Sequence, residues 1–182
     1  MMTTPAVLMM MLCLNPNAAP PPANANAVAE VEANDPLAPW NGTWRGTFIA
    51  YRADGQPLYR IDVEQTYEMV KPNTQRGVFV NRYADGTTQT VHAVNLVEQG
   101  RLVCRVRPID ANGKGTGKVK QHIGHRIGPG HIIWYSDLGG GRFESFNEVV
   151  QGDRYTIHGV GVYGDKPADR HIFEAVYQRV GK

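Results

Sequence analysis

Apolar and polar residues alternate along most of the chain after residue 40, and the alternation starts in the stretch 41–50. Here Trp44 and Phe48 fall on one face, and the residues between them fall on the other. Side chains of a β-strand point alternately to opposite sides of the sheet. The stretch therefore predicts a first strand whose large indole points inward between two glycines, Gly42 and Gly46.

Turn signals rich in Gly, Asn and Asp recur at regular intervals after this strand, for example at 53–55, 85–86 and 139–141. Such residues tolerate the positive φ of tight hairpin turns. The segments between the turns are predicted strands at 43–52, 58–70, 76–83, 87–97, 101–108, 118–127, 131–138, 142–150, 154–163 and 170–180. No segment after residue 40 has the apolar period of a long helix. Closing such a meander removes its exposed edges, so the pattern predicts an all-β fold: a single antiparallel up-and-down barrel of about ten strands.

Alternation also predicts which side chains face the interior. They are Tyr59, Ile61, Val63, Gln65, Tyr67 and Met69 on 58–70; Leu102, Cys104 and Val106 on 101–108; and Val119, Gln121, Ile123 and His125 on 118–127. His158 is the expected inward residue of 154–163, although the parity of that segment and of 131–138 stays open. On 170–180 alternation separates a face with His171, Phe173, Ala175, Tyr177 and Arg179 from a face with Ile172, Glu174, Val176, Gln178 and Val180. Several polar groups in this set would be costly without partners, so we expect a cavity that holds water or a ligand.

The Gly-x-Trp opening at Gly42 and Trp44, the strands that follow and a closing strand with Arg179 together resemble the calycin barrels. This group includes lipocalins, fatty-acid-binding proteins, nitrobindin-like haem barrels and bilin-lyase barrels, and the resemblance runs from Trp40 to Val180. It implies that Arg179 stacks on Trp44, which turns the face of 170–180 with His171, Tyr177 and Arg179 inward. It also implies that Gly42, Trp44 and Gly46 are structural. The predicted ligand-binding residues are Tyr67, Gln121, His125, His158, His171, Tyr177 and Arg179.

The resemblance to nitrobindin-like barrels implies a haem ligand on the closing strand. His171 follows the turn signals at 164–167 and is the matching residue. The spacing between this histidine and the final Arg-Val differs by one residue from the spacing in that family. A slip of one residue turns a side chain to the other face of a strand. His158 and His125 are the alternatives, and His171 would be a metal ligand only if haem is bound.

The first 27 residues contain a short apolar run without acidic residues and end in Ala25-Asn26-Ala27. The run is too short to span a bilayer and the small residues suit cleavage before Val28, so 1–27 is a predicted signal peptide and the protein is predicted to be secreted or periplasmic. A disordered tail that is never cleaved is the alternative. Residues 28–39 are a predicted linker, and 40–182 are the predicted barrel domain.

Charge and cysteine content narrow the possible partners. The net charge is +2, and the basic residues between Arg101 and Arg126 are expected on a solvated outer face. Without interleaved aromatic residues this face does not indicate a nucleic-acid partner. No apolar stretch of the predicted barrel domain is long enough to cross a membrane. Once the signal peptide is removed Cys104 would be the only cysteine, and we expect it in the core.

The leading hypothesis is an exported, non-enzymatic calycin-like barrel that holds a small, mainly apolar molecule. An anionic group on that molecule would meet Arg179 and Tyr177. The alternatives are a nitrobindin-like haem barrel, a bilin-lyase-like barrel, and a structural or interaction barrel with a filled core.

Overall fold

The computed structural model describes residues 35–181, so the predicted signal peptide lies outside the described residues. These residues form ten strands and two short 3-10 helices. The elements are η1 (Ala38–Trp40), β1 (Gly42–Arg52), β2 (Pro57–Lys71), β3 (Thr74–Tyr83), β4 (Thr88–Glu98), β5 (Arg101–Ile109), β6 (Lys120–Gly128), β7 (His131–Gly139), β8 (Arg142–Gln151), β9 (Arg154–Val162), η2 (Pro167–Asp169) and β10 (Arg170–Val180). Each predicted strand overlaps one of them, and the all-β prediction is confirmed.

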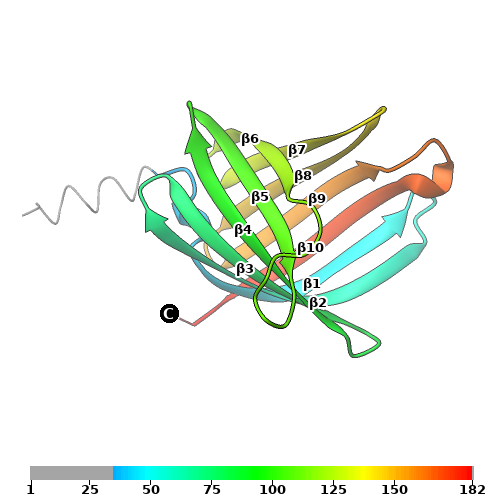
Figure 1. The fold of residues 1–182 in the computed structure, drawn as a ribbon, viewed down its shortest axis with the longest axis horizontal. Helices are drawn as coiled ribbons and strands as arrows, with labels where there is room; N and C mark the ends of the chain where they lie inside the picture. The colour runs from blue at the N-terminus through cyan, green and yellow to red at the C-terminus, as the bar shows by residue number, and fades with distance from the viewer. Residues whose placement is uncertain (1–34, 182) are drawn as a thin grey trace, which may run out of the picture.

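The strands close into one barrel in which every strand pairs antiparallel with its neighbours in sequence. The first and last strands form the closing seam, from Thr43 opposite Val180 to Arg52 opposite His171. Figure 1 shows β1 beside the red β10, although the two are separated by almost the whole described chain. The predicted up-and-down barrel is therefore the observed fold.

Gly46 lets β1 and β10 approach each other closely. A Cβ atom at this position would overlap the Val176 carbonyl oxygen and lie 2.8 Å from Tyr177 Cα. The ring of Tyr177 also lies over the glycine, with Cδ1 at 2.9 Å from the same point. Any larger residue at position 46 would have to displace β10 or the Tyr177 side chain.

The predicted interior faces of β2 and β10 are confirmed. Ile61, Val63 and Tyr67 are buried on β2, and Phe173 and Tyr177 are buried on β10. The structure also settles β7, whose Ile132, Trp134 and Ser136 are buried. On β2 alternation was sufficient, because the inward positions are mainly apolar and the outward positions mainly charged or polar. On β10 both faces carry apolar residues, and the family resemblance indicated the correct face.

The predicted parity of β6 is wrong. Lys120 and His122 point to the interior, whereas Gln121 and His125 are exposed. The strand starts at Lys120, and Val119, which suggested the opposite parity, lies before it and is also exposed. Glu144 of β8 pairs with both Lys120 and His122, which makes these polar side chains stable on the inner face.

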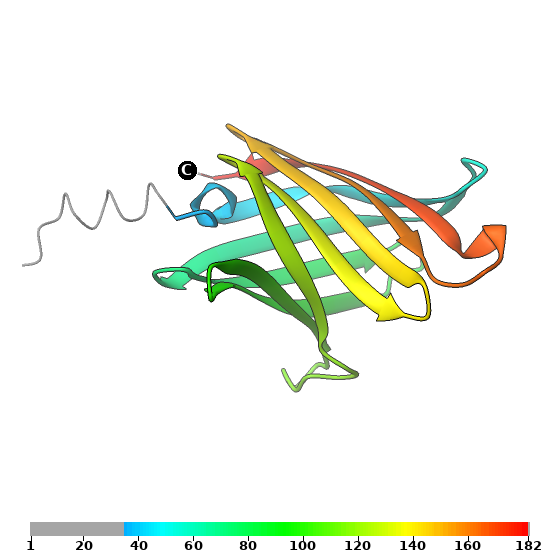
Figure 2. The same cartoon turned by 90° about the horizontal axis from the view of Figure 1, so that it is seen from above.

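Residues 35–41 close one end of the barrel. Leu37 and Trp40 are buried against the core, so the described end of the predicted linker is a packed part of the barrel domain. The buried Gln75 amide donates hydrogen bonds to the Leu37 carbonyl oxygen at 2.9 Å and to Asn41 Oδ1 at 2.8 Å. Figure 2 shows the blue turn of η1 at the same end as the C-terminus of the described chain.

Arg179 ties this closed end to the last strand. Its guanidinium carbon lies 4.0 Å from the ring centre of Trp44. It also donates hydrogen bonds to the Pro39 carbonyl oxygen, at 3.1 Å, and to that of Asn41. The stacking of Arg179 on Trp44 that the resemblance implied is thus present in the structure.

None of the helices within residues 35–181 has the length and apolar composition needed to cross a bilayer.

Candidate ligand cavity

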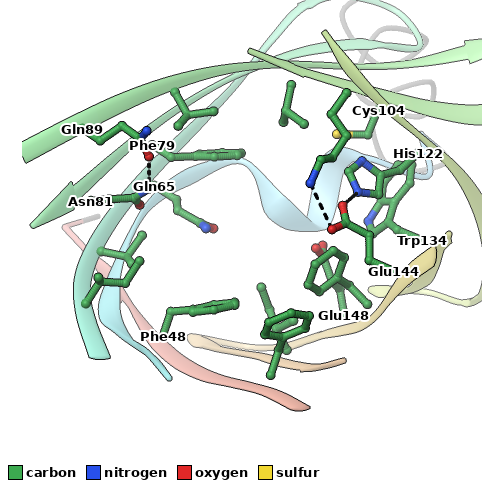
Figure 3. Close-up of a pocket in the computed structure, with 18 of the residues that line it drawn as sticks. Phe48, Gln65, Phe79, Asn81, Gln89, Cys104, His122, Trp134, Glu144 and Glu148 are labelled. Carbon is green, nitrogen blue, oxygen red and sulfur yellow. Dashed lines mark hydrogen bonds and ion pairs between the residues drawn. The ribbon is translucent and has the colours of Figure 1, made fainter. Parts of the chain in front are cut away.

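The barrel interior contains a cavity of about 380 Å³ (Figure 3). It runs from Tyr59, Tyr83 and Gln89 at the open end toward the closed end. Its apolar lining residues are Phe48, Ile61, Val63, Phe79, Val91, Val106, Trp134, Phe146, Ile157 and Phe173. Its polar lining residues are Gln65, Asn81, Asn95, Lys120, His122, Glu144 and Glu148, together with Cys104 and the tyrosines Tyr59, Tyr67, Tyr83, Tyr163 and Tyr177 and the amide of Gln89.

Glu144 is the centre of a charged cluster on the cavity wall. Its Oε1 lies 2.6 Å from His122 Nε2, and its Oε2 lies 3.0 Å from Lys120 Nζ and 2.8 Å from the Tyr163 hydroxyl. Burial raises the pKa of this carboxyl, but the hydrogen bond with His122, the charge of Lys120 and the Tyr163 hydroxyl outweigh it and lower the pKa to about 2. Because an ionised carboxylate only accepts hydrogen bonds, His122 carries a proton on Nε2.

Glu148 lies four residues after Glu144 on the same face of β8, nearer the closed end of the barrel, and has a different environment. Within residues 35–181 it takes part in no ion pair. Burial raises the pKa of its carboxyl, and the Tyr155 hydroxyl and the indole N–H groups of Trp134 and Trp40 oppose this only in part, leaving a pKa of about 7. Figure 3 shows Glu148 among the side chains that surround the cavity.

Polar groups without hydrogen-bond partners surround Glu148. The hydroxyls of Tyr155 and Tyr177 and the indole N–H of Trp40 are buried, and none of them has a partner at normal hydrogen-bond geometry among the described residues. Tyr67 donates a hydrogen bond to Gln65 Oε1 at 3.2 Å. Burial raises the pKa of Tyr67, Tyr155 and Tyr177, so all three hydroxyls stay protonated at neutral pH.

Cys104 lines the cavity and is paired with His122 on the adjacent strand β6. Burial and the nearby carboxyl of Glu148 raise the pKa of the thiol. A thiol that stays protonated is a weak nucleophile. Cys104 is therefore a lining residue, in line with its predicted interior position.

No protein-family model matches the sequence, and a search of curated proteins finds no match. Among solved structures, the chain is similar to Rv2717c from M. tuberculosis, with a TM-score of 0.57 at 16% identity over 80% of this chain and 95% of that one. It is also similar to the S-type phycobiliprotein lyase CPES from Guillardia theta, with a TM-score of 0.57 at 8% identity over 84% of this chain and 97% of that one. The likeness shows that the chain shares the fold of these two structures, which in this chain is a closed antiparallel β-barrel. At these identities the likeness concerns the fold alone.

The barrel brings only some of the predicted ligand-binding residues together. Tyr67 and Tyr177 line the cavity. Gln121 and His125 are on the outer face of β6, and His158 is exposed on the outer face of β9, next to the inward-facing Ile157. These three cannot contact a molecule in the cavity, and their predicted inward orientation is wrong.

Arg179 and His171 lie on the predicted face of β10 but do not line the cavity. The Arg179 guanidinium stacks on the Trp44 ring, and its Nε is 3.3 Å from Asp153 Oδ1. His171 is half-buried near the open end, with its ring centre 5.1 Å from that of Tyr163. No group of three or more His, Cys, Asp or Glu side chains is placed to hold a metal ion within residues 35–181.

The sequence analysis missed four charged or titratable residues that line the cavity: Lys120, His122, Glu144 and Glu148. The pattern of β8 contained a signal, because Glu144 and Glu148 share a face with Phe146 and Val150. Two acids on the same face as a phenylalanine indicate either an exposed apolar residue or buried carboxyls. The alternation alone does not distinguish these cases.

Proposed function

We propose that this calycin-like barrel binds a small, mainly apolar molecule in its interior. The observation that carries the proposal is the cavity of about 380 Å³, lined by ten apolar side chains together with tyrosine, amide and charged side chains. Ligand sites in proteins have this composition and volumes of about 300–1,000 Å³. A filled-core structural barrel would not leave such a space.

The charges of the cavity argue against the anionic ligand group suggested by the sequence. Arg179, its expected partner, does not line the cavity. Lys120 is already paired with Glu144, and Glu148 adds a second carboxyl. An anion would lose its hydration without gaining a free cation among the described lining residues. The proposal therefore concerns a ligand without a negative charge.

Titration with a neutral, environment-sensitive fluorescent probe tests this proposal. The wild-type protein is expected to enhance the probe's emission in a saturable way. The Val106→Trp substitution fills the cavity from β5 and should weaken binding at least about tenfold. Val94→Trp makes the same change at an exposed position of β4 and should bind like the wild type. Absence of saturable binding to the wild type, or equal affinity in the two variants, would contradict the proposal.

Haem binding stays a prediction of the family resemblance, and the cavity residues do not fit it well. His171, His158 and His125 do not line the cavity. Of the histidines within residues 35–181, His122 alone lines it, and its Nε2 is bonded to Glu144. A haemin titration checks the prediction: a saturating Soret band that disappears in His171→Ala would support it. Export and a bilin-lyase activity likewise stay predictions.

A further inference from the structure

Glu148 gives the deep end of the cavity a carboxyl group without a counter-charge. Every group that faces it from the surrounding elements is uncharged. They are Trp40 of η1, Tyr67 of β2, Cys104 of β5, Trp134 of β7, Tyr155 of β9 and Tyr177 of β10. A buried carboxyl is expensive to ionise without a cation. This site is therefore electrostatically incomplete in the protein alone.

The hydroxyl of Tyr177 adds a second, independent sign that a ligand group belongs here. Tyr177 is 1% exposed and lines the cavity, and its hydroxyl has no hydrogen-bond partner among the described residues. Buried hydroxyls of native proteins nearly always have a partner. A polar group placed beside Glu148 would provide the missing partner.

We propose that Glu148 and Tyr177 bind a protonated amine at the end of an otherwise apolar or aromatic ligand. This inference rests on the proposed function and names the class of ligand. An ammonium group has three N–H donors. It can donate hydrogen bonds to the two oxygens of the Glu148 carboxylate and a third to the Tyr177 hydroxyl oxygen.

The chemistry of the surrounding side chains favours an amine over other occupants. Aromatic rings attract cations. Tyr67, Trp134 and Tyr177 all lie close enough to Glu148 to interact with its carboxyl group, so a cation beside this carboxyl would also be near aromatic rings. An anion would be repelled by the carboxylate. A metal ion would need a set of several ligands, which the described residues do not assemble here.

The site predicts a pH dependence with a definite sign. Burial raises the pKa of Glu148 to about 7, while the other titratable groups that face it, Tyr67, Cys104, Tyr155 and Tyr177, have raised pKa values and stay neutral. Below pH 7 the carboxyl is largely protonated and attracts an ammonium group weakly. Amine affinity should therefore rise as the pH increases from 6 to 8, over which range an alkylamine stays protonated.

Calorimetry with a matched pair of ligands, 4-phenylbutylamine and 4-phenylbutan-1-ol, tests the proposal. The two differ mainly in the charge of the terminal group. At pH 8 the wild type should bind the amine at least about tenfold more tightly than the alcohol, and the preference should shrink at pH 6. Glu148→Gln should remove the preference, whereas Glu174→Gln, on the exposed face of β10, should retain it.

The outcomes separate this inference from the proposed function. If the wild type binds the neutral fluorescent probe but shows no preference for the amine, the amine site is wrong and the cavity-binding proposal stands. A preference that survives in Glu148→Gln or does not change between pH 6 and 8 also overturns the amine site. If neither the probe nor the ligand pair binds, both proposals fail. The pH series on the wild type decides the question even if Glu148→Gln does not fold.

Discussion

Glu144 and Glu148 lie four residues apart on the same face of β8, yet their carboxyl groups differ widely in acidity. The pKa is about 2 for Glu144 and about 7 for Glu148. Both are buried, so desolvation raises both values; what differs is the partners. Glu144 has a lysine, a histidine and a tyrosine hydroxyl, whereas Glu148 has only weakly interacting neutral groups. Individual contacts thus determine the charge of each carboxyl.

Glu144 should stabilise the fold in a pH-dependent way. Its pKa is about 2 in the folded protein against 4.5 as the ordinary value, so its contribution is complete above pH 4.5 and is lost as the pH falls toward 2. We expect Glu144→Gln to lower the free energy of unfolding by about 2–3 kcal/mol at pH 7. Urea unfolding at pH 7 and pH 2.5 should show the difference from the wild type narrowing at the lower pH. An equal loss at both values would contradict this assignment, and Glu174→Gln is the control.

At the scale of single elements, sequence patterning located the strands well and failed on one strand for a clear reason. On β2 burial alone decides which face is inside, and alternation found it. On β10 both faces carry apolar residues, and the inward face was found through the family resemblance. On β6 the inward residues Lys120 and His122 depend on Glu144, which is more than twenty residues later in the chain. A local pattern does not contain that partner. The same limit hid the packing of Leu37 and Trp40, whose contacts come from distant strands.

The β1–β10 seam should be sensitive to a single methyl group. Gly46→Ala would overlap the Val176 carbonyl oxygen and push against Tyr177, so we expect a loss of about 1–3 kcal/mol in stability. Gly128→Ala is the matched control, because a Cβ atom there has no neighbour within 4 Å. Thermal unfolding of both variants measures the difference. Equal melting temperatures would show that the seam can relax around an added side chain.

At the scale of the whole molecule, the barrel has one closed and one open end. Ring closure and the number of strands could be predicted because an open meander of this length leaves exposed edges. The closed end depends on tertiary contacts of Gln75, Trp44 and Arg179 with residues 35–41. The sequence indicated none of these contacts; at this end it indicated only the stacking of Arg179 on Trp44, through the family resemblance. The cavity was expected from the polar interior, but its charged residues were not.

Arg179→Leu should destabilise the closed end without changing the cavity lining. The substitution removes the stacking on Trp44 and leaves the carbonyl groups of Pro39 and Asn41 without their donor. We expect a loss of about 2–4 kcal/mol in the free energy of unfolding, measured by urea titration, and probe affinity within about twofold of the wild type. Arg170→Leu, at the exposed start of β10, is the control. An unchanged stability would contradict the structural role of Arg179.

The even number of strands has a practical consequence for handling the protein. With ten antiparallel strands, β1 begins and β10 ends at the same end of the barrel, beside η1. Figure 2 shows this end opposite the far tips of the β1–β2 and β9–β10 hairpins. A reporter domain or a solid support attached after Gly181 would therefore sit at the plugged base. The cavity entrance would stay free, so the protein can be immobilised by its C-terminus for binding measurements without obstructing access to the cavity.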